Sequence, residues 1–467
     1  MFCNFSNQKK VIFISILAIN IKIVQINILS MNVKTGLLLA FVLFSTQGIM
    51  AQTQVFKGAK IYPISGEPIE NGVLVIKNGK IESVGKENDV KIPKGAEVTD
   101  VTGKVIMPGL VDSHSHIGNG DGGDGSGPLH PDVRILDAID VNSDTFKKAR
   151  AGGITTVNIM PGSGHLMSGQ TAYVKLRKDP RTINDMLFVS DPINEIAGGM
   201  KMANGTNSLR GKPFPGTRGK SAAMVRELFV KAQNYKSKIE AAKGDKSKIP
   251  ARDLELEAIV QVLAGKRVVH FHTHRHDDIM TILRLKKEFG FKVVLHHVSE
   301  GWKVAKEIAE AGVPCSIITI DSPGGKMEAV DLIFETGGIL ERAGVLVGYH
   351  TDDGITDSRL FLRSAAIGYR AGMSEKKALE SLTIANAKML DLDSRVGTLE
   401  KGKDADFLIL SGNPLSVYTH VLQTWVEGQK VFDYSNPDDK KYLTGGPDVF
   451  RGEFYSHHDD MSEGDMK

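Results

Sequence analysis

Strand-like apolar runs alternate with helical stretches through the middle of this chain. The runs cover residues 154–160, 186–190, 268–274, 293–298, 315–320 and 345–350. Helices are predicted between and after them at 277–289, 301–311, 329–343, 358–371 and 374–390. Alternation of this kind joins parallel strands through crossover helices, and eight such units close a barrel. We therefore predict an α/β fold, a TIM (β/α)8 barrel, over residues 108–394.

Short segments rich in β-branched residues flank this region at both ends. They cover residues 55–61, 72–77, 80–84, 405–410 and 421–431. Because the ends of a chain often lie close together, we expect residues 52–107 and 395–434 to form one small β-sandwich domain. Residues 435–467 are polar and are expected to form a C-terminal tail.

The first fifty residues have the pattern of a targeting segment. Lys34, a short apolar run at 36–44 and the small residue Ala51 match a secretory signal peptide. We expect residues 1–51 to be removed and residues 1–30 to be a start-site extension, because Met31 opens this pattern. The protein would then be exported, to the periplasm or outside the cell, with no stable membrane span. The alternative is a single N-terminal membrane anchor.

Composition excludes several classes of protein. The chain has 58 Lys and Arg against 55 Asp and Glu, so it lacks the basic footprint of a nucleic-acid-binding protein. Two cysteines rule out a disulfide framework. Histidine is the unusual residue, because six of the 14 lie between His270 and His297.

A His-x-His pair follows the first strand of the predicted barrel. It closes the segment Pro108-Gly-Leu-Val-Asp-Ser-His114-Ser-His116. Residues i and i+2 of a strand share a face, so both imidazoles can reach one ion. At the C-terminal end of a barrel strand they would face the catalytic side. The alternative is a polar loop with two incidental histidines.

More candidate ligands stand at the ends of later strands. His272 and His274 share a strand face, His297 ends the next strand, and Asp352 follows another. Several imidazoles and one carboxylate from separate strand ends are a typical Zn²⁺ ligand set that leaves a position for water.

The segment that ends at His116 resembles the start of the barrel in the amidohydrolase superfamily. The resemblance continues in order along residues 55–432, and within the superfamily it is greatest to the imidazolonepropionase-like and metal-dependent prolidase-like branch. It is carried by Gly153-Ile-Thr-Thr-Val157, His272-Thr-His274, Val294-Leu-His-His297, Gly348-Tyr-His-Thr-Asp352 and Thr383-Ile-Ala-Asn-Ala-Lys388.

The resemblance implies a metal-dependent hydrolase and names its ligands. They are His114 and His116 on the first strand, His272 on the fifth with His274 as a rival, His297 on the sixth and Asp352 on the eighth. On the fourth strand, Lys201 is similar to the carbamylated lysine that bridges two metals in relatives. Close relatives often have Gly-Glu-Asn where this chain has Gly205-Thr206-Asn207, which lacks a possible acidic ligand. The number of Zn²⁺ ions, one or two, therefore stays open. His296 stands where relatives usually carry an acidic residue.

Three further residues are candidates for substrate binding. His165, in a glycine-rich loop, and Arg275 could contact a substrate carboxylate, the arginine through bidentate hydrogen bonds. His350 shares a face with Asp352 and could orient the site. Each could equally be structural. For His270 and His276 we expect a supporting or surface role.

The implied reaction is hydrolysis of a C–N bond in a small amide, cyclic amide or dipeptide. A bound metal lowers the pKa of water toward ~7, and Asp352, with His297 beside it, would move the proton to the leaving amine. Alternatives are a prolidase-like dipeptidase or a deaminase on the same site. A non-catalytic barrel scaffold is a further alternative, against which the presence of every expected ligand argues. Whether the chain forms a homo-oligomer stays open.

Overall fold

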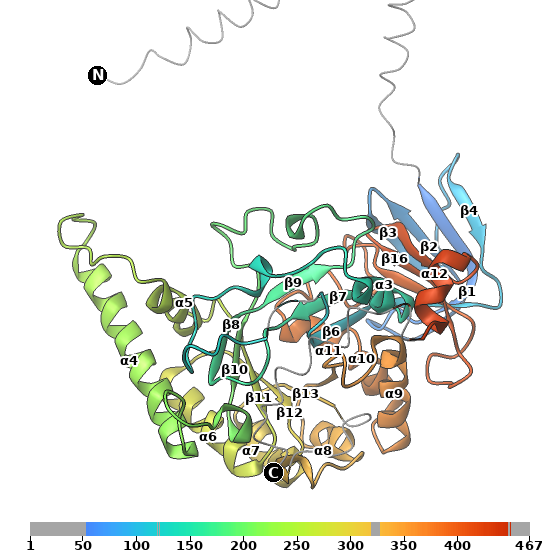
Figure 1. Ribbon diagram of the computed structural model, residues 1–467. Coiled ribbons are helices and arrows are strands. Elements are labelled where there is room, and N and C mark those ends of the chain that lie inside the picture. Colours follow the sequence, from blue (N-terminus) through green and yellow to red (C-terminus); the bar gives the residue numbers. More distant parts are fainter. Residues whose placement is uncertain (1–52, 119, 121, 319–326, 447–448, 450–467) are drawn as a thin grey trace, which may run out of the picture. The chain divides into compact units, whose positions relative to one another are not determined.

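The computed structural model describes residues 53–118, 120, 122–318, 327–446 and 449, within one compact unit that begins at Thr53 (Figure 1). The predicted signal peptide, most of the predicted tail and the end of the strand predicted at 315–320 lie outside these residues. In the part of the chain that is described, no helix combines the length and hydrophobicity of a membrane span.

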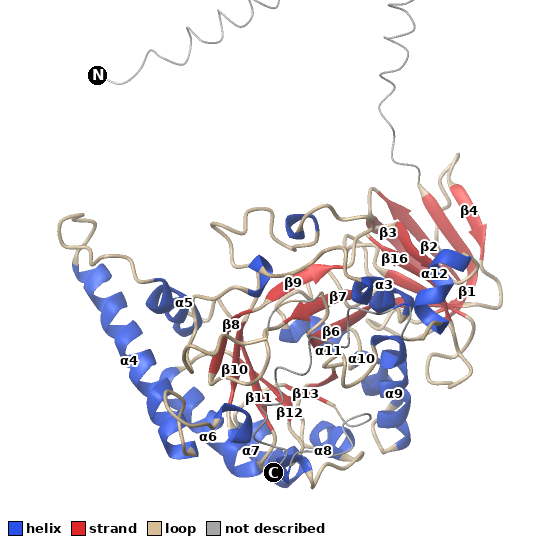
Figure 2. Cartoon of the chain, in the orientation of Figure 1, coloured by secondary structure: helices blue, strands red, loops and turns tan. Residues whose placement is uncertain are grey.

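Parallel strands joined by helices make up the centre of the molecule (Figure 2). One sheet has the order β14-β13-β12-β11-β10-β8, in which the five strands from β10 to β14 are parallel. Its strands are β8 (Met167–Gln170), β10 (Met200–Ala203), β11 (Val269–Thr273), β12 (Val293–His297), β13 (Cys315–Ile317) and β14 (Val347–Tyr349). Every residue of β10 to β14 is buried, which is typical of parallel strands covered on both faces.

A second, three-stranded sheet continues this arrangement. It pairs β6 (Leu110–Ser115) with β7 (Ile154–Ile159) in parallel, and β7 with β9 (Ala172–Lys175) in antiparallel fashion. One extended stretch supplies β8 to the first sheet and β9 to the second. At the opposite edge, the backbone amide of Asp352 donates to the carbonyl of His114 at 2.9 Å. The fold is therefore TIM-barrel-like, but the strand ladders of the described residues form two sheets and not one closed barrel.

Helices follow the strands much as the alternation predicts. They are α3 (Asp144–Ala151), α4 (Arg218–Ala241), α5 (Leu254–Leu263), α6 (His276–Phe289), α7 (Ala305–Glu310), α8 (Thr336–Arg342), α9 (Phe361–Arg370), α10 (Glu375–Glu380) and α11 (Ile384–Met389). The single helix predicted at 374–390 is two helices, separated around Ser381. Within the helix predicted at 329–343, Ala329 ends a short 3-10 helix, Met327–Ala329, and only α8 in the second half is α-helical.

One predicted strand is wrong. Residues 186–190 follow a short 3-10 turn, Ile183–Asp185, and form only an isolated bridge between Leu187 and Val174. Met186 and Leu187 are buried, so they pack as loop residues and not as part of a strand. Strand β10, which carries Lys201, takes the place beside β11 instead.

The two chain ends meet in a third sheet, of eight strands. Its order is β17-β16-β15-β5-β1-β2-β3, with β4 paired to β1. The strands are β1 (Gln54–Ile61), β2 (Ile69–Lys77), β3 (Lys80–Lys86), β4 (Glu97–Asp100), β5 (Val105–Pro108), β15 (Phe407–Leu410), β16 (Val421–Val426) and β17 (Gln429–Asp433). Antiparallel pairing of β15 with β5 joins the two ends. The expected sandwich is not confirmed, because both ends contribute to one sheet.

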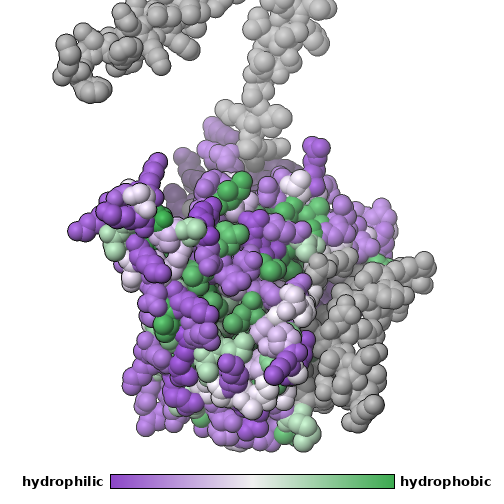
Figure 3. Space-filling view, turned by 60° about the vertical axis from the view of Figure 1, so that its left-hand side comes forward, coloured by the Kyte–Doolittle hydropathy of each residue, from purple (hydrophilic) through white to green (hydrophobic). Residues whose placement is uncertain are grey.

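The start of the predicted tail is a helix. Residues Pro437–Thr444 form α12, and its Tyr442 hydroxyl donates to Asp144 of α3 at 3.2 Å. The face of the molecule shown in Figure 3 is largely hydrophilic, with hydrophobic residues in small groups between the polar ones.

Candidate metal centre

The predicted ligands are brought together from separate strands. His114 lies on β6, Lys201 on β10, His272 on β11 and His297 on β12, and Asp352 follows β14. The four strand residues are at most 3% exposed. Parallel strands end at the same edge of a sheet, which is why residues distant in sequence meet here.

Short contacts join the first-strand histidines to Asp352 and Lys201. His114 Nε2 lies 3.3 Å from His116 Nε2. The same carboxylate oxygen, Asp352 Oδ1, is 3.3 Å from His114 Nε2 and 3.0 Å from His116 Nε2. Lys201 Nζ lies 3.0 Å from His114 Nε2. The inward nitrogens of both histidines therefore point toward one carboxylate.

His297 completes this group from β12. Its Nδ1 lies 3.9 Å from Asp352 Oδ2, and its buried Nε2 has no hydrogen-bond partner among the described residues. Both residues adopt left-handed backbone conformations, with φ of +70° for His297 and +49° for Asp352. Such conformations are uncommon for residues other than glycine and occur often at functional sites.

Burial keeps the central imidazoles neutral. It lowers the pKa of His114 and of His297 well below the usual value, with further lowering by neighbouring imidazoles and Lys201. Burial likewise lowers the pKa of His350 to about 3. A neutral imidazole keeps a lone pair, which is the form that binds a metal.

Asp352 is ionised at neutral pH. Burial alone would raise the pKa of its carboxyl group, but the hydrogen bond with His116 and the positive charge of Lys201 lower that pKa below its usual range. A carboxylate next to neutral imidazoles is a Zn²⁺-type donor set.

Hydrogen bonds from outside the group orient two of these rings. His116 Nδ1 lies 2.9 Å from the carbonyl oxygen of Met160, to which it donates, and this leaves Nε2 toward Asp352. His350 Nδ1 contacts the Ser316 hydroxyl at 2.8 Å, and its Nε2 lies 3.3 Å from His297 Nδ1. Contacts of this kind hold metal-ligating histidines in place.

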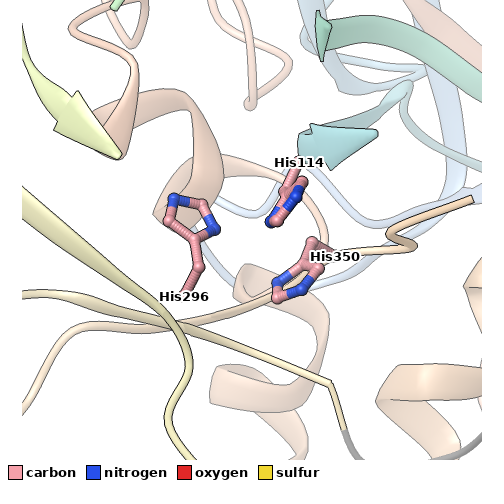
Figure 4. A group of neighbouring side chains, drawn as sticks. All are labelled: His114, His296 and His350. Carbon is pink, nitrogen blue, oxygen red and sulfur yellow. The ribbon is translucent and has the colours of Figure 1, made fainter. Parts of the chain in front are cut away.

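His296 also faces the centre, which the sequence did not predict. The rings of His114, His296 and His350 gather around a common space in Figure 4. Consecutive residues of a regular strand point to opposite faces, yet the His114 ring lies 4.9 Å from His296 and 5.0 Å from His297. The left-handed conformation of His297 ends the strand there and allows both rings to contact His114.

A hydrogen-bonded chain supports His296 from behind. The Tyr173 hydroxyl lies 2.9 Å from His270 Nε2, and His270 Nδ1 lies 3.0 Å from His296 Nε2. His270 therefore has the supporting position expected for it.

Two predicted substrate-binding residues have their described contacts elsewhere. Arg275 forms a bidentate pair with Asp277, both bonds 2.9 Å, and its side chain is 41% exposed. His165 packs its ring 5.1 Å from that of Phe214. Of the three candidates, His350 alone has a described contact with His297.

Three groups of described side chains could hold a divalent ion, and two of them, His114–His296–His350 and His114–His297–Asp352, share His114. One ligand atom each of His114, His297 and Asp352 lies within 4.8 Å of the others, and the same holds for His272, His274 and Glu328. Glu328 was not predicted, because it stands outside every motif of the sequence.

Residues 105–438 match the sequence profile of the amidohydrolase family. The chain belongs to the amidohydrolase family. A solved amidohydrolase of Thermotoga maritima MSB8 is 34% identical, with a TM-score of 0.74 over 81% of this chain and 99% of that one.

Two curated relatives extend the family comparison. The amidohydrolase tasK of Hapsidospora irregularis is 26% identical over 78% of this chain, which spans only 40% of that longer protein. The imidazolonepropionase of Fusobacterium nucleatum is 22% identical over 84% of this chain and 98% of its own length. Family membership makes this amidohydrolase an enzyme that acts on C–N bonds.

Proposed function

We propose that this amidohydrolase uses a divalent metal to hydrolyse the C–N bond of a small amide, cyclic amide or dipeptide. The observation that supports it is the convergence of Asp352 Oδ1 on His114 and His116, at 3.3 and 3.0 Å, beside His297. The Asp352 carboxylate therefore lies among imidazoles at the strand ends. We also propose export, on the pattern of residues 1–51.

The proposed ligands are His114, His116, Lys201, His272, His297 and Asp352. Zn²⁺ is the proposed ion, because imidazole nitrogens and a carboxylate oxygen match its preferences. When bound, the ion supplies a lower pKa for water and polarises the substrate carbonyl. Lys201 would become an anionic oxygen ligand only after carbamylation, since its Nζ now donates to His114 Nε2.

Asp352 is the proposed proton carrier. Its carboxylate is ionised, so it can accept a proton from water and deliver it to the nitrogen of the leaving amine. His297 Nδ1 lies 3.9 Å from the second carboxylate oxygen. His350 orients His297 through the 3.3 Å contact between their ring nitrogens.

Replacing Asp352 by Asn tests this role. Asp352→Asn keeps the shape of the side chain but cannot carry the proton, so we expect turnover to fall at least ~100-fold while most of the metal is retained. Activity is measured on dipeptides, N-acyl amino acids and cyclic ureides, with and without chelator, together with metal content.

The matched control is Asp391→Asn, because Asp391 pairs with Lys292 at the surface with its side chain 53% exposed. The control should keep full activity. Near-normal turnover by Asp352→Asn, or activity that no chelator reduces, would contradict the proposal.

A further inference from the structure

A cavity of about 380 Å³ opens at the end of the central strands opposite the proposed metal centre. Its wall includes Arg267, two residues before β11, and Ala197, three residues before β10. The proposed ligands His272 and Lys201 lie further along the same two strands. Among the described residues that line the cavity, none belongs to the proposed metal centre. A cavity of this size can accommodate a small molecule.

The wall of this cavity contains a buried guanidinium that has no carboxylate partner among the described residues. Arg267 is 4% exposed. Its Nη1 donates to the backbone carbonyls of Gly198 and Gly199 at 2.9 and 3.2 Å. Its Nε and Nη2 donate to Gln261 Oε1 at 3.1 and 2.7 Å. Every described acceptor is neutral, whereas buried charges in proteins are normally paired, so an anionic group in the cavity would stabilise Arg267.

Arg267 keeps its positive charge at neutral pH. Burial, and to a smaller extent the neighbouring charge of Arg134, lowers the pKa of Arg267 to about 10, which still leaves the guanidinium protonated. Arg134 also lines the cavity, but Asp137 balances its charge through two contacts of 3.0 Å. Arg267 is therefore the cation of the described wall that lacks a carboxylate.

Donors for a carboxylate group lie side by side in this wall. Gln261 lines the cavity, and because its Oε1 is turned to Arg267, its Nε2 points away from the guanidinium. Neither this amide nitrogen nor the remaining N–H of Arg267 Nη2 has an acceptor among the described residues. An arginine beside an amide suits a carboxylate, which accepts several charge-assisted hydrogen bonds.

The rim of the cavity carries the opposite charge. Asp132 and Glu195 line the cavity, are exposed, and form no ion pair within the described part of the chain. Between the charged groups the wall is apolar, because Ile193 and Leu254 line it with exposed fractions of 87% and 60%. One buried cation, two carboxylates and an apolar surface therefore share one cavity.

We propose that this cavity binds a free α-amino acid with an apolar side chain. Its carboxylate contacts Arg267 and Gln261 inside the cavity, and its ammonium group lies toward Asp132 and Glu195 at the rim. A zwitterion is the small molecule that supplies both charges at once, and its side chain covers the exposed apolar residues of the wall. The inference goes beyond the proposed function and does not depend on it, because the two sites share no residue.

Calorimetric titration of the full chain with L-leucine tests this inference. Leucine is compared with 4-methylpentanoate, which lacks the ammonium group, and with 3-methylbutylamine, which lacks the carboxylate. Neither analogue has a C–N bond that hydrolysis would cleave. Leucine should bind, and each analogue should bind at least about 10-fold more weakly, because each loses the hydrogen bonds of one charged group.

Replacing the buried arginine tests the carboxylate contact. Arg267→Met should weaken leucine binding at least about 10-fold. Arg150→Met is the matched control, because Arg150 is also buried, at 7% exposure, and donates to a backbone carbonyl, that of Leu176 at 3.0 Å, but lies outside the cavity wall. The control should bind leucine as wild type does.

A second variant keeps the test valid if Arg267→Met does not fold, which circular dichroism detects. Asp132→Asn with Glu195→Gln changes two exposed side chains. This double variant should lose the preference for leucine over 4-methylpentanoate, because both rim charges are removed.

Four results would overturn the inference. They are no leucine binding to wild type at millimolar concentrations, unchanged binding by Arg267→Met, binding of 3-methylbutylamine as tight as that of leucine, and an unchanged preference in the double variant. Asp352→Asn separates the two sites and should bind leucine normally. Loss of leucine binding in that variant alone would place leucine at the metal centre, which would refute this inference and leave the proposed function standing.

Discussion

Glu300 is a single residue whose ionised carboxylate links a loop to a helix, so its contribution to stability depends on pH. It accepts hydrogen bonds from the His276 backbone amide at 2.9 Å, from the His276 ring at 2.6 Å and from Lys303 Nζ at 3.0 Å. Burial would raise the pKa of its carboxyl group, but these bonds outweigh burial and lower the pKa to about 2. Glu300 therefore connects the loop after β12 to the start of α6.

The contribution of Glu300 to stability should disappear in acid. The pKa is lower in the folded chain than the ordinary 4.5, so the ionised group stabilises the fold above pH 4.5, and this contribution falls as pH drops toward 2. Urea unfolding of wild type and Glu300→Gln should show a difference in free energy at pH 7 that shrinks between pH 4.5 and 2. A difference that stays constant with pH would mean that the charge is not its source.

At the scale of the element, packing determines which face of helix α4 is buried. Phe229 is fully buried, and its ring lies 5.2 Å from that of Phe289 and 5.4 Å from that of Phe291, at the end of α6 and just after it. The next residue, Val230, is 46% exposed. Adjacent positions on this helix therefore differ in environment although both are apolar.

Substitutions at these neighbours should differ strongly in effect. Phe229→Ala removes a ring from a packed aromatic cluster and should destabilise the fold by about 3–5 kcal/mol. Val230→Ala should change the free energy of unfolding by less than about 0.5 kcal/mol, since surface substitutions rarely do more. Chemical denaturation of both variants measures this, and similar losses would mean that the helix is packed on a different face.

At the scale of the whole molecule, a buried ionic cluster ties the central sheets to the sheet of the chain ends. Lys175 of β9 is fully buried, and its Nζ lies 2.8 Å from Asp406 and 3.3 Å from Glu427, with Asp404 also in contact. Arg177 forms a further pair with Glu427 at 2.7 Å. The carboxylates come from the segments around β15 and β16, so the cluster spans both parts of the fold.

Removing the lysine should destabilise the whole unit. Lys175→Met leaves Asp406 buried without the cation that pairs with it, whereas Asp404 keeps Arg395 and Lys80. Breaking a buried group by removing one partner costs about 3–5 kcal/mol. Adding Asp406→Asn to Lys175→Met removes this unpaired charge and should recover part of the loss. Thermal and urea unfolding measure both, and a double variant that is less stable than Lys175→Met would show that the cluster is not held by charge.

Much of the architecture follows from local patterns. The order of strands and helices from β11 to α9 was predictable, because strand and helix periodicities are properties of neighbouring residues. The convergence of His114, His116 and Asp352 was predictable from their positions at strand ends, together with the family resemblance. The strand predicted at 186–190 failed because burial alone does not distinguish a packed loop from a strand.

Long-range contacts were decided by the tertiary structure alone. His296 shares a sheet face with its ladder partner His272, and the left-handed backbone of His297 brings the next ring to the same centre. Glu328 reaches His272 and His274 from a short helix with no motif of its own. The pairing of β15 with β5 and the division of the central strands into two sheets are likewise settled by contacts between distant segments. The sequence by itself determined the elements, the family and the group at His114, since these depend on local periodicity and short motifs. The contacts between buried charged residues depend on packing in three dimensions, and local sequence patterns do not predict them.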